Sequence, residues 1–273
     1  MTKVNFSQAD DPKLERAAEL ARASFKYFWR EMVWEGQRII PGLELAAVKV
    51  PFFDSGKDAP ETEFLWMNEL TFDGEALSGT VLNQPLALES VSAGDARQVK
   101  PDQITDWMYV VGRKVYGAYS VQVLREGMRA GERAGHDRAW GLKFPKPPIV
   151  HVVPPDWFGR KSEGGFLGKL FGGTPVIPLS LDELEGLEHP MAVNMLEAFL
   201  DLEPGGEHVT VRDDAGLTML HRMALAGAAP IVAVLLEHGA DVAAKTNAGF
   251  TALDLAERLA WREAAEHLRA AAR

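Results

Sequence analysis

Apolar residues recur with helical spacing near the start of the chain. Asp11-Pro12 is suited to begin a helix, because Asp can cap free backbone N–H groups and Pro is tolerated in the first turn. The apolar positions that follow are three or four residues apart: Leu14, Ala18, Ala21, Phe25, Phe28 and Met32. This spacing places them on one face of a helix, with charged residues elsewhere. We expect this aromatic-rich face to be part of the core and to pack on a sheet.

Short apolar runs closed by Gly, Asn or Pro follow this helix and predict a compact antiparallel sheet. We expect strands at residues 43–53, 63–72, 75–82, 115–124 and 149–153, a helical turn at 102–107 and a helix at 125–139. Asp73-Gly74 predicts a hairpin turn, because Gly accepts a positive φ. Gly117 is expected where another backbone or an aromatic ring approaches closely.

The order of motifs in this stretch resembles a known family. The motifs are Glu63 and Trp66, Gly79 with Asn83-Gln84-Pro85, Gly94-Asp95, the run from Ile104 to Met108, and Gly117. Over residues 12–128 they resemble the YegJ-like bacterial domain, domain of unknown function 2314. That family has no established activity, so the resemblance implies no catalytic residues. We interpret the motif residues as structural, with Trp66 and Trp107 as core anchors.

Residues 154–180 are rich in Gly and Pro and predict a linker. The stretch around Lys169 is glycine-rich but is not a phosphate-binding loop, because no Ser or Thr follows the Lys and the glycine spacing differs.

The C-terminal third contains an internal repeat. Ala215-Gly-Leu-Thr218-Met-Leu-His221 recurs 33 residues later as Ala248-Gly-Phe-Thr251-Ala-Leu-Asp254. Together with the downstream Gly239-Ala240-Asp241, this unit resembles the ankyrin repeat. One unit covers residues 214–246, a shorter one covers 247–271, and a degenerate first unit covers 181–213.

The resemblance implies paired helices that begin at Thr218 and Thr251 and bury a shared apolar face. Asp254 stands where the family has His, and Met219 and Ala252 stand where it has Pro. So few units cannot bury a solenoid core alone, so we expect the N-terminal domain or the linker to cap the first repeat. The sequence thus predicts an α+β protein: an antiparallel sheet domain with packed helices at 1–153, the linker, and a short all-α ankyrin stack at 181–273.

The negative charge is concentrated in the repeats. The formal net charge is −10, and residues 181–273 hold 16 acidic and 7 basic side chains, against 23 and 22 in the first 180 residues. Such a surface repels nucleic acid and favours a basic partner. The chain has no cysteine, which excludes disulfides and thiolate catalysis, and no run of apolar residues long enough to span a membrane. Its first residues lack the apolar core of a signal peptide, so a cytoplasmic protein is expected.

These patterns favour a non-enzymatic module that binds another protein, acting as an adaptor or as an immunity protein against a basic toxin. In ankyrin stacks the loops and the first helices form the binding surface. The corresponding positions here are Arg212, Asp213, Asp214, Leu217, Met219, Arg222, Lys245, Thr246 and Phe250. Leu217 and Phe250 occupy equivalent places, and we expect them to be an apolar hot spot unless they fold onto the neighbouring domain.

An enzyme of unknown reaction is the alternative. His151, together with Asp106, Glu63 or Tyr119, is the one constellation that could form a site, although a single His on a strand is usually structural. No metal-spaced histidine pair occurs in the sequence, so we expect no catalytic residues, metal or cofactor. A pI near 5.2 also argues against nucleic acid as a partner.

Overall fold

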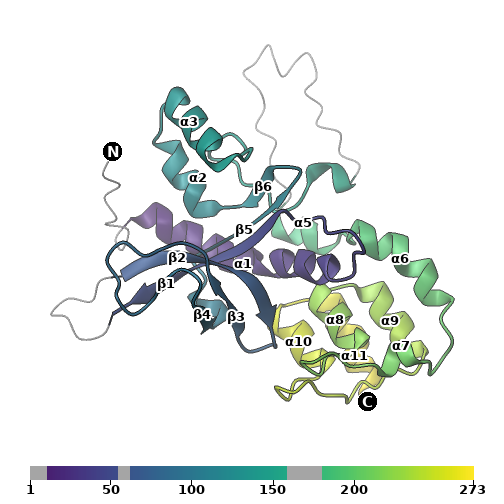
Figure 1. The fold of residues 1–273 in the computed structure, drawn as a ribbon. Coiled ribbons are helices and arrows are strands. Elements are labelled where there is room, and N and C mark those ends of the chain that lie inside the picture. Colours follow the sequence, from purple (N-terminus) through teal and green to yellow (C-terminus); the bar gives the residue numbers. More distant parts are fainter. Residues whose placement is uncertain (1–10, 55–61, 159–179) are drawn as a thin grey trace, which may run out of the picture. The chain divides into compact units, whose positions relative to one another are not determined.

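The computed structural model describes residues 11–54, 62–158 and 180–273 (Figure 1). In chain order, its elements are α1 (Pro12–Glu35), β1 (Leu45–Phe53), β2 (Thr62–Phe72), β3 (Leu77–Val81), β4 (Ala96–Val99), the short 3-10 helix η1 (Pro101–Gln103), β5 (Asp106–Val111), β6 (Lys114–Gly117), α2 (Tyr119–Glu126), α3 (Ala130–Trp140), η2 (Pro155–Phe158), α5 (Leu181–Glu185), α6 (Pro190–Leu200), α7 (Glu207–Thr210), α8 (Met219–Ala226), α9 (Ala229–Glu237), α10 (Ala252–Arg258) and α11 (Arg262–Ala271).

The chain forms two compact units. The first consists of Met1–Ser24 and Gly42–Val152, and the second of Phe25–Pro41 and Val153–Arg273. Helix α1 therefore contributes its first turns to one unit and its later turns to the other. Most of the linker expected at 154–180 lies outside the described residues.

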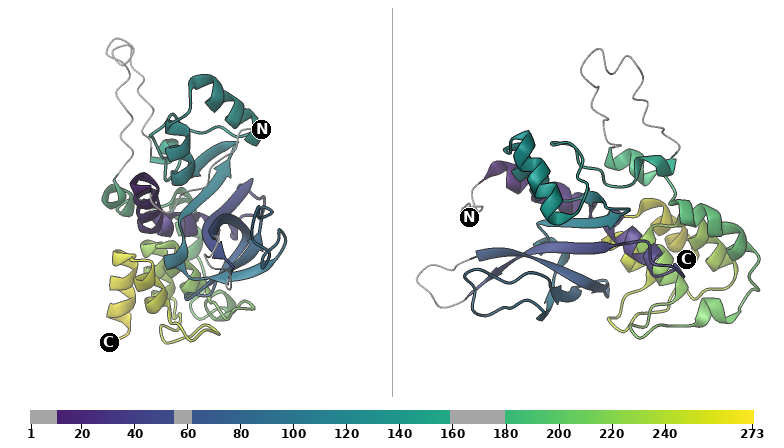
Figure 2. Two further views of the ribbon diagram at one scale, coloured as in Figure 1. Left: turned by 90° about the vertical axis from the view of Figure 1, so that its left-hand side faces the viewer. Right: turned by 45° about the horizontal axis from the view of Figure 1, so that its top comes forward.

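The first unit is built on one antiparallel sheet, as the sequence predicts, with the strand order β4-β3-β2-β1-β5-β6. Two further views show the twist of this sheet (Figure 2). The predicted hairpin turn is present: Oδ1 of Asp73 accepts hydrogen bonds from the backbone N–H groups of Glu75 and Ala76, both at 2.8 Å, and Gly74 has a φ of +99°.

Apolar side chains cover both faces of the sheet. Residues paired directly across antiparallel strands point to the same face, so Val48 and Trp107 share one face and Ala47 and Met108 the other. On the first face, the indole Nε1 of Trp107 donates to the carbonyl of Ala21 in α1 at 2.9 Å. On the second face, Trp66, Ala47, Met108 and Val121 of α2 pack in one buried cluster. Both tryptophans are therefore core anchors, as expected.

Three predicted elements differ from the structure. Residues 106–111 form a strand rather than the end of a helical turn, because their aromatic and β-branched side chains suit the sheet. The strand expected at 115–124 ends at Gly117, after which α2 begins. Residues 149–153 form no strand: prolines flank the segment on both sides, and the described residues give it a single sheet-like bond, from Gly117 N to His151 O at 2.8 Å.

Gly117 lies where the sequence predicts a close approach. Its φ is +73°, and a Cβ at this position would collide with the carbonyl oxygen and the ring of Trp107. A larger residue here would push the end of β6 away from the strand beside it.

The second unit contains the repeats as paired helices. Helices α8 and α9 form one pair, α10 and α11 form the next, and α5 and α6 precede them (Figure 1). Trp261, just before α11, fixes one pair to the next because its Nε1 donates to the carbonyl of Leu225 at 3.0 Å. Its ring also packs so closely on Gly227 that no Cβ would fit there.

The later turns of α1 cover the repeats within this second unit. The hydroxyl of Tyr27 donates to the carbonyl of Leu181 at 2.6 Å, and its ring meets that of Trp261 edge-on at 5.5 Å. Lys26 forms an ion pair with Glu185 at 3.0 Å. Hydrogen bonds from Arg262 and Lys26 outweigh the effect of burial and lower the pKa of Glu185 to about 2. A segment far away in sequence thus supplies the apolar cover that so short a stack needs.

Candidate protein-binding surface

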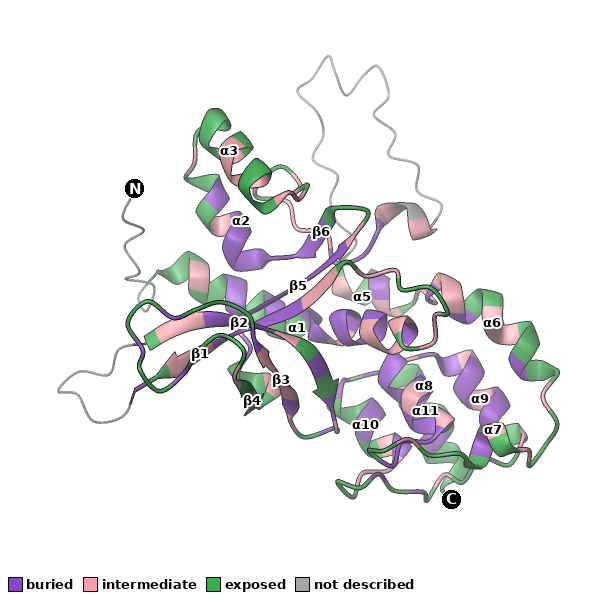
Figure 3. Cartoon of the chain, viewed as in Figure 1, coloured by how far each residue is buried: buried purple, intermediate pink, exposed green. Residues whose placement is uncertain are grey.

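Two neighbouring loops of the second unit form the candidate binding surface. We call them the finger loops: residues 212–217, which precede α8, and residues 245–250, which precede α10. Figure 3 shows that both are largely exposed, in contrast to the buried faces of α8 and α9. Seven of the nine residues predicted to bind a partner lie in these loops, and the other two, Met219 and Arg222, follow in α8.

Hydrogen bonds to backbone carbonyls hold the two finger loops together. The guanidinium of Arg212 donates to the carbonyl of Lys245 at 2.6 Å. Nδ2 of Asn247 donates to the carbonyl of Asp214 at 2.8 Å, and the backbone N–H of Asn247 donates to Ala215 O at 2.9 Å. The two loops therefore form one braced surface, which loses little conformational entropy when it binds a partner.

The buried side chain of His221 forms hydrogen bonds with the backbone beside both finger loops. Its Nδ1 accepts a hydrogen bond from the backbone N–H of Thr218 at 3.1 Å, so the ring carries its proton on Nε2. Nε2 then donates to the carbonyls of Ala244 and Phe250, at 3.1 and 3.2 Å. Burial lowers the pKa of His221, which keeps the ring neutral as this arrangement requires.

The predicted residues differ in what they offer a partner. Leu217 and Thr246 are buried, with 6% and 5% of their surface exposed, and so shape the loops from inside. Asp213 and Arg222 form an ion pair at 2.9 Å, and Oδ1 of Asp213 also accepts from the backbone N–H of Leu217 at 2.8 Å. The residues left with exposed or half-exposed side chains are Arg212, Asp214, Met219, Lys245 and Phe250.

Phe250 is half-buried, and the guanidinium of Arg258 lies 4.1 Å from its ring centre. The sequence-based selection omitted both Arg258 and Asn247. Asn247 could have been found from the repeat itself, because it follows Asp214 at the 33-residue period and so belongs to the same turn of the next unit. Arg258, on α10, follows Phe250 by two helical turns, and its contact could not be read from the loop alone.

The alternative constellation in the first unit is used for structure. Asp106 is fully buried, and its carboxylate accepts hydrogen bonds from Ser120 Oγ at 2.6 Å, from Ser120 N at 2.8 Å and from Tyr119 N at 2.9 Å. It therefore caps the first turn of α2. Burial raises the pKa of Asp106, and its bonds with Ser120 oppose that rise.

Glu63 and His151, two further members of that constellation, have different surroundings. The Glu63 carboxylate accepts hydrogen bonds from the backbone N–H groups of Leu86, Ala87 and Leu88 and so holds a loop. His151 is half-buried, and burial, with Lys114 nearby, lowers the pKa of its imidazole. Among the hydrogen bonds of the described residues, none joins His151 to Asp106 or Glu63.

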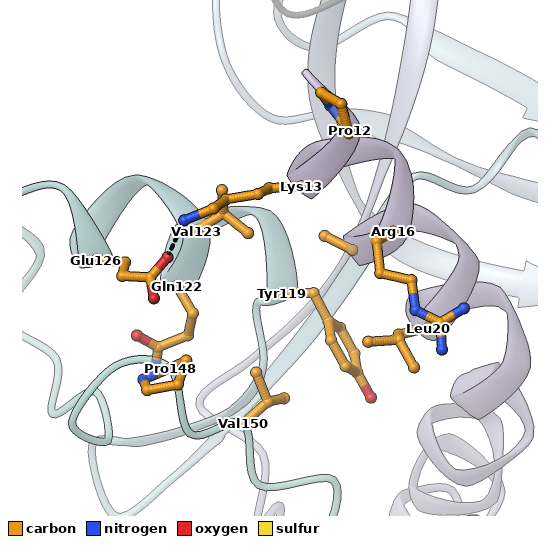
Figure 4. A pocket seen from close by; sticks show the side chains of 11 residues that line it. Pro12, Lys13, Arg16, Leu20, Tyr119, Gln122, Val123, Glu126, Pro148 and Val150 are labelled. Carbon is orange, nitrogen blue, oxygen red and sulfur yellow. Dashed lines mark hydrogen bonds and ion pairs between the residues drawn. The ribbon is translucent and has the colours of Figure 1, made fainter. Parts of the chain in front are cut away.

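A cavity of about 410 Å³ lies between the first turns of α1 and α2 in the first unit (Figure 4). Leu20, Val123 and Val150 give it apolar walls, and an ion pair between Lys13 and Glu126, at 2.7 Å, closes part of its rim. The hydroxyl of Tyr119 in its wall is bonded to Ser24 at 2.6 Å. Since these polar side chains have partners inside the fold, they do not converge on a ligand position.

The described residues hold neither a candidate metal site nor a helix that could span a membrane. Within residues 11–54, 62–158 and 180–273, no three His, Asp or Glu side chains converge in the way a metal ion would require. Over the same ranges, none of the helices has both the length and the apolar character needed to cross a bilayer.

Comparison with known proteins gives matches to both parts of the chain. Residues 11–144 match the model of DUF2314, an uncharacterized protein conserved in bacteria, and residues 205–256 match ankyrin repeats. Over 262 residues the chain is 38% identical to the putative ankyrin repeat protein NMB1133/NMB1171 of Neisseria meningitidis serogroup B, covering 96% of this chain and 94% of that protein. It is also 35% identical over 78 residues to the uncharacterized protein YegJ of Escherichia coli, which covers 29% of this chain and 48% of YegJ.

Proposed function

Because the chain belongs to the same family as the meningococcal protein, a DUF2314 domain followed by ankyrin repeats, we propose that it binds another protein through its finger loops. Ankyrin repeats are protein–protein interaction modules, and stacked loops are their usual binding surface. The observation that carries the proposal is the bracing of the two loops by Arg212 and Asn247. That bracing holds a surface of mixed charge in a single conformation.

The charge of the second unit favours a basic partner. Residues 181–273 carry 16 acidic and 7 basic side chains, and of the basic ones in or beside the finger loops Arg222 is paired with Asp213 and Arg212 with the carbonyl of Lys245. A basic partner would be drawn in by this field and would bind more weakly as salt is added. An immunity protein that covers a basic toxin or nuclease is the sharper form of this proposal, and an adaptor is the broader one.

The test reverses one charge in the finger loops and compares it with the same reversal elsewhere in the second unit. The side chain of Asp214 is exposed and makes none of the bracing bonds, since only its backbone carbonyl is used. Glu266 on α11 is equally exposed and serves as the matched site. Partners would be captured from cell lysate at low and high salt by wild type, Asp214→Lys and Glu266→Lys.

We expect one basic protein to be retained by wild type and by Glu266→Lys, to be lost with Asp214→Lys, and to weaken with salt. An effect of equal size from both substitutions would assign binding to overall charge and would exclude the loops as the site. A retained partner that is acidic, or insensitive to salt, would exclude the basic-partner proposal.

A further inference from the structure

Lys49 is a buried cation in the middle of the sheet. It lies on the central strand β1, paired with Trp66 of β2 on one side and with Asp106 of β5 on the other. Only 7% of its surface is exposed. Lysine is almost never buried to this extent unless its ammonium has a partner.

The ammonium of Lys49 has no such partner among the described residues: no carboxylate lies within 4 Å of Nζ, and Nζ donates no hydrogen bond. The carboxylate of its neighbour Asp106 is occupied by donors from Trp107, Tyr119 and Ser120. The ring of Trp66 is within reach of a cation–π contact, with its centre 5.8 Å from Nζ. Burial lowers the pKa of Lys49, and the charge of Asp106 opposes this effect only in part. A buried polar group left unpaired costs free energy, and such groups cluster at functional sites.

Lys49 lines a cavity of about 260 Å³. Burial orders the cavity from inside to outside, with buried Lys49 and Ser120 at the inner end and exposed Asp11 and Glu15 of α1 at the outer end. Leu14 and Phe64 provide apolar wall between them. The cavity therefore joins a cation, an apolar surface and two carboxylates within a volume suited to a small molecule.

The hydroxyl groups in the cavity add acceptors but no donors. Thr105 Oγ1 already donates to the carbonyl of Lys49 at 3.0 Å, and Ser120 Oγ already donates to Asp106 at 2.6 Å. Each oxygen keeps lone pairs that can accept. A ligand would thus meet one cationic donor, Lys49, and an excess of acceptors.

These features exclude most simple ligands. A plain anion would suit Lys49 but would be repelled by Asp11 and Glu15, and a plain cation would be repelled by Lys49. A neutral apolar molecule would leave the ammonium unpaired. A molecule that carries an anionic group, a cationic donor and a small apolar part would match the ammonium of Lys49, the two carboxylates and the apolar wall.

We propose that this cavity binds a small apolar α-amino acid, whose carboxylate pairs with Lys49 while its ammonium faces the hydroxyl oxygens and the carboxylates of Asp11 and Glu15. The arriving carboxylate favours the charged form of Lys49. At a pH above the pKa that Lys49 has in the unliganded protein, binding therefore takes up a proton. Affinity therefore falls as pH rises through that pKa. This site is separate from the finger loops and does not depend on how they bind a partner.

The probes are L-leucine, its decarboxylated analogue 3-methylbutylamine and its deaminated analogue 4-methylpentanoate. Each would be titrated into the full chain by calorimetry, in buffers of different ionisation enthalpy so that proton uptake is measured. The variant Lys49→Met keeps the length of the side chain and removes its charge. Lys146→Met, at an exposed lysine of the same unit, is the matched control.

We expect saturable binding of L-leucine with proton uptake at alkaline pH, and at least tenfold weaker binding of both analogues. Lys49→Met should lose at least tenfold in affinity and Lys146→Met should lose none. Lys49→Met removes a buried charge, so it is expected to fold, and its circular dichroism spectrum would verify this. Equal binding of 4-methylpentanoate would overturn the zwitterion assignment. No saturable binding of L-leucine, or binding unchanged in Lys49→Met, would overturn the site.

Discussion

At the scale of single residues, the polar side chains behind the DUF2314 resemblance act on the backbone of their own fold. Glu63 holds a loop through three backbone N–H groups, and Oδ1 of Asn83 accepts from Trp66 N at 2.9 Å. Asp106 caps α2. Their acceptors are already occupied, so these motif residues explain why the sheet domain folds and leave its function to other residues, among which Lys49 is the clearest.

Replacing Asp106 by Asn tests this structural role. The variant leaves one amide oxygen and places an NH2 group against the donors of Tyr119 and Ser120, so we expect a loss of about 3 kcal/mol in the free energy of unfolding, measured by urea titration. Asp73→Asn is the matched control, because an Asn oxygen can accept the two turn bonds that Asp73 accepts; its expected cost is under about 0.5 kcal/mol. Equal losses in the two variants would contradict the capping role.

Glu188, in the second unit, predicts a pH dependence. Burial and the charge of Glu263 raise its pKa to about 7, against the opposing charge of Arg30. The folded state then binds a proton that the unfolded state releases near pH 4.5. The contribution of Glu188 to the free energy of unfolding is therefore fully present below pH 4.5 and is lost as the pH rises through about 7.

Urea unfolding at pH 5 and pH 8 measures this effect. Because Glu188 is partly exposed, we discount its contribution to about 1–2 kcal/mol. Glu188→Gln should lose that much less stability between the two pH values than wild type does. Comparing the variant with wild type cancels the contributions that other titratable groups make to the pH dependence of stability. One of these is His189, whose pKa is lowered by burial and whose contribution has the opposite sign. Identical pH profiles for the two proteins would refute the prediction.

At the scale of elements, the two repeat units use the same position for different purposes. His221 caps its own helix and reaches the carbonyls of Ala244 and Phe250, so it joins two units. Asp254, at the equivalent position, only exchanges cap bonds with Thr251, at 2.7 and 3.2 Å. The His221 side chain therefore connects two units, whereas the Asp254 side chain serves the helix of its own unit.

The substitution His221→Asp should therefore be costly while leaving the helix cap in place. We expect a loss of about 2–3 kcal/mol, because the carbonyls of Ala244 and Phe250 lose their donor at a buried site. Asp254→Ala removes an exposed cap and should cost about 1 kcal/mol. Thermal and urea unfolding of both variants would measure the difference. A cost for Asp254→Ala as large as that for His221→Asp would contradict the bridging role.

Sequence patterns predicted elements best where the signal is local. The Asp73-Gly74 turn, the first helix and the repeat helices depend on neighbours a few residues apart, and all are present. The sequence predicts a helical turn at 102–107, whereas residues Asp106–Val111 form strand β5. Asp106 does cap a helix, but that helix is α2, which begins at Tyr119 after β5 and β6. Nothing in the local sequence indicates a cap that acts across two strands.

The candidate sites were predictable only in part. Leu217 and Phe250 are equivalent in sequence, yet Leu217 is buried in the first finger loop, whereas Phe250 in the second stays half-exposed. The sequence pattern does not single out Lys49, because the strand predicted at 43–53 is otherwise mostly apolar. One signal could have found it: a single charge between Val48 and Val50, at a position whose alternation with Ala47 points it into the core.

At the scale of the whole molecule, the compact units do not follow the order of the sequence. The second unit includes Phe25–Pro41, that is, the later turns of α1 and the residues after it, which the sequence assigns to the sheet domain. Tyr27 and Trp34 in this segment are fully buried, and the ring of Trp34 stacks on that of His189 at 5.4 Å. The repeats therefore depend on side chains that precede them by some 150 residues.

This dependence predicts how the chain can be divided. A fragment of residues 180–273 lacks Tyr27 and Trp34, each of which contributes on the order of 2 kcal/mol by burial. A stack of so few units has little stability to lose, so we expect the fragment to be largely unfolded by circular dichroism. Amide hydrogen exchange in α8–α11 should be much faster in the fragment than in the full chain.

A peptide of residues 24–38, added to the fragment, should restore helicity and protection from exchange in a saturable manner, because it returns the missing cover. The same peptide with Tyr27→Ala and Trp34→Ala is the control and should restore neither. A fragment as protected as the full chain would show that the repeats close their own core. The later turns of α1 would then be an addition to the stack rather than a part of it.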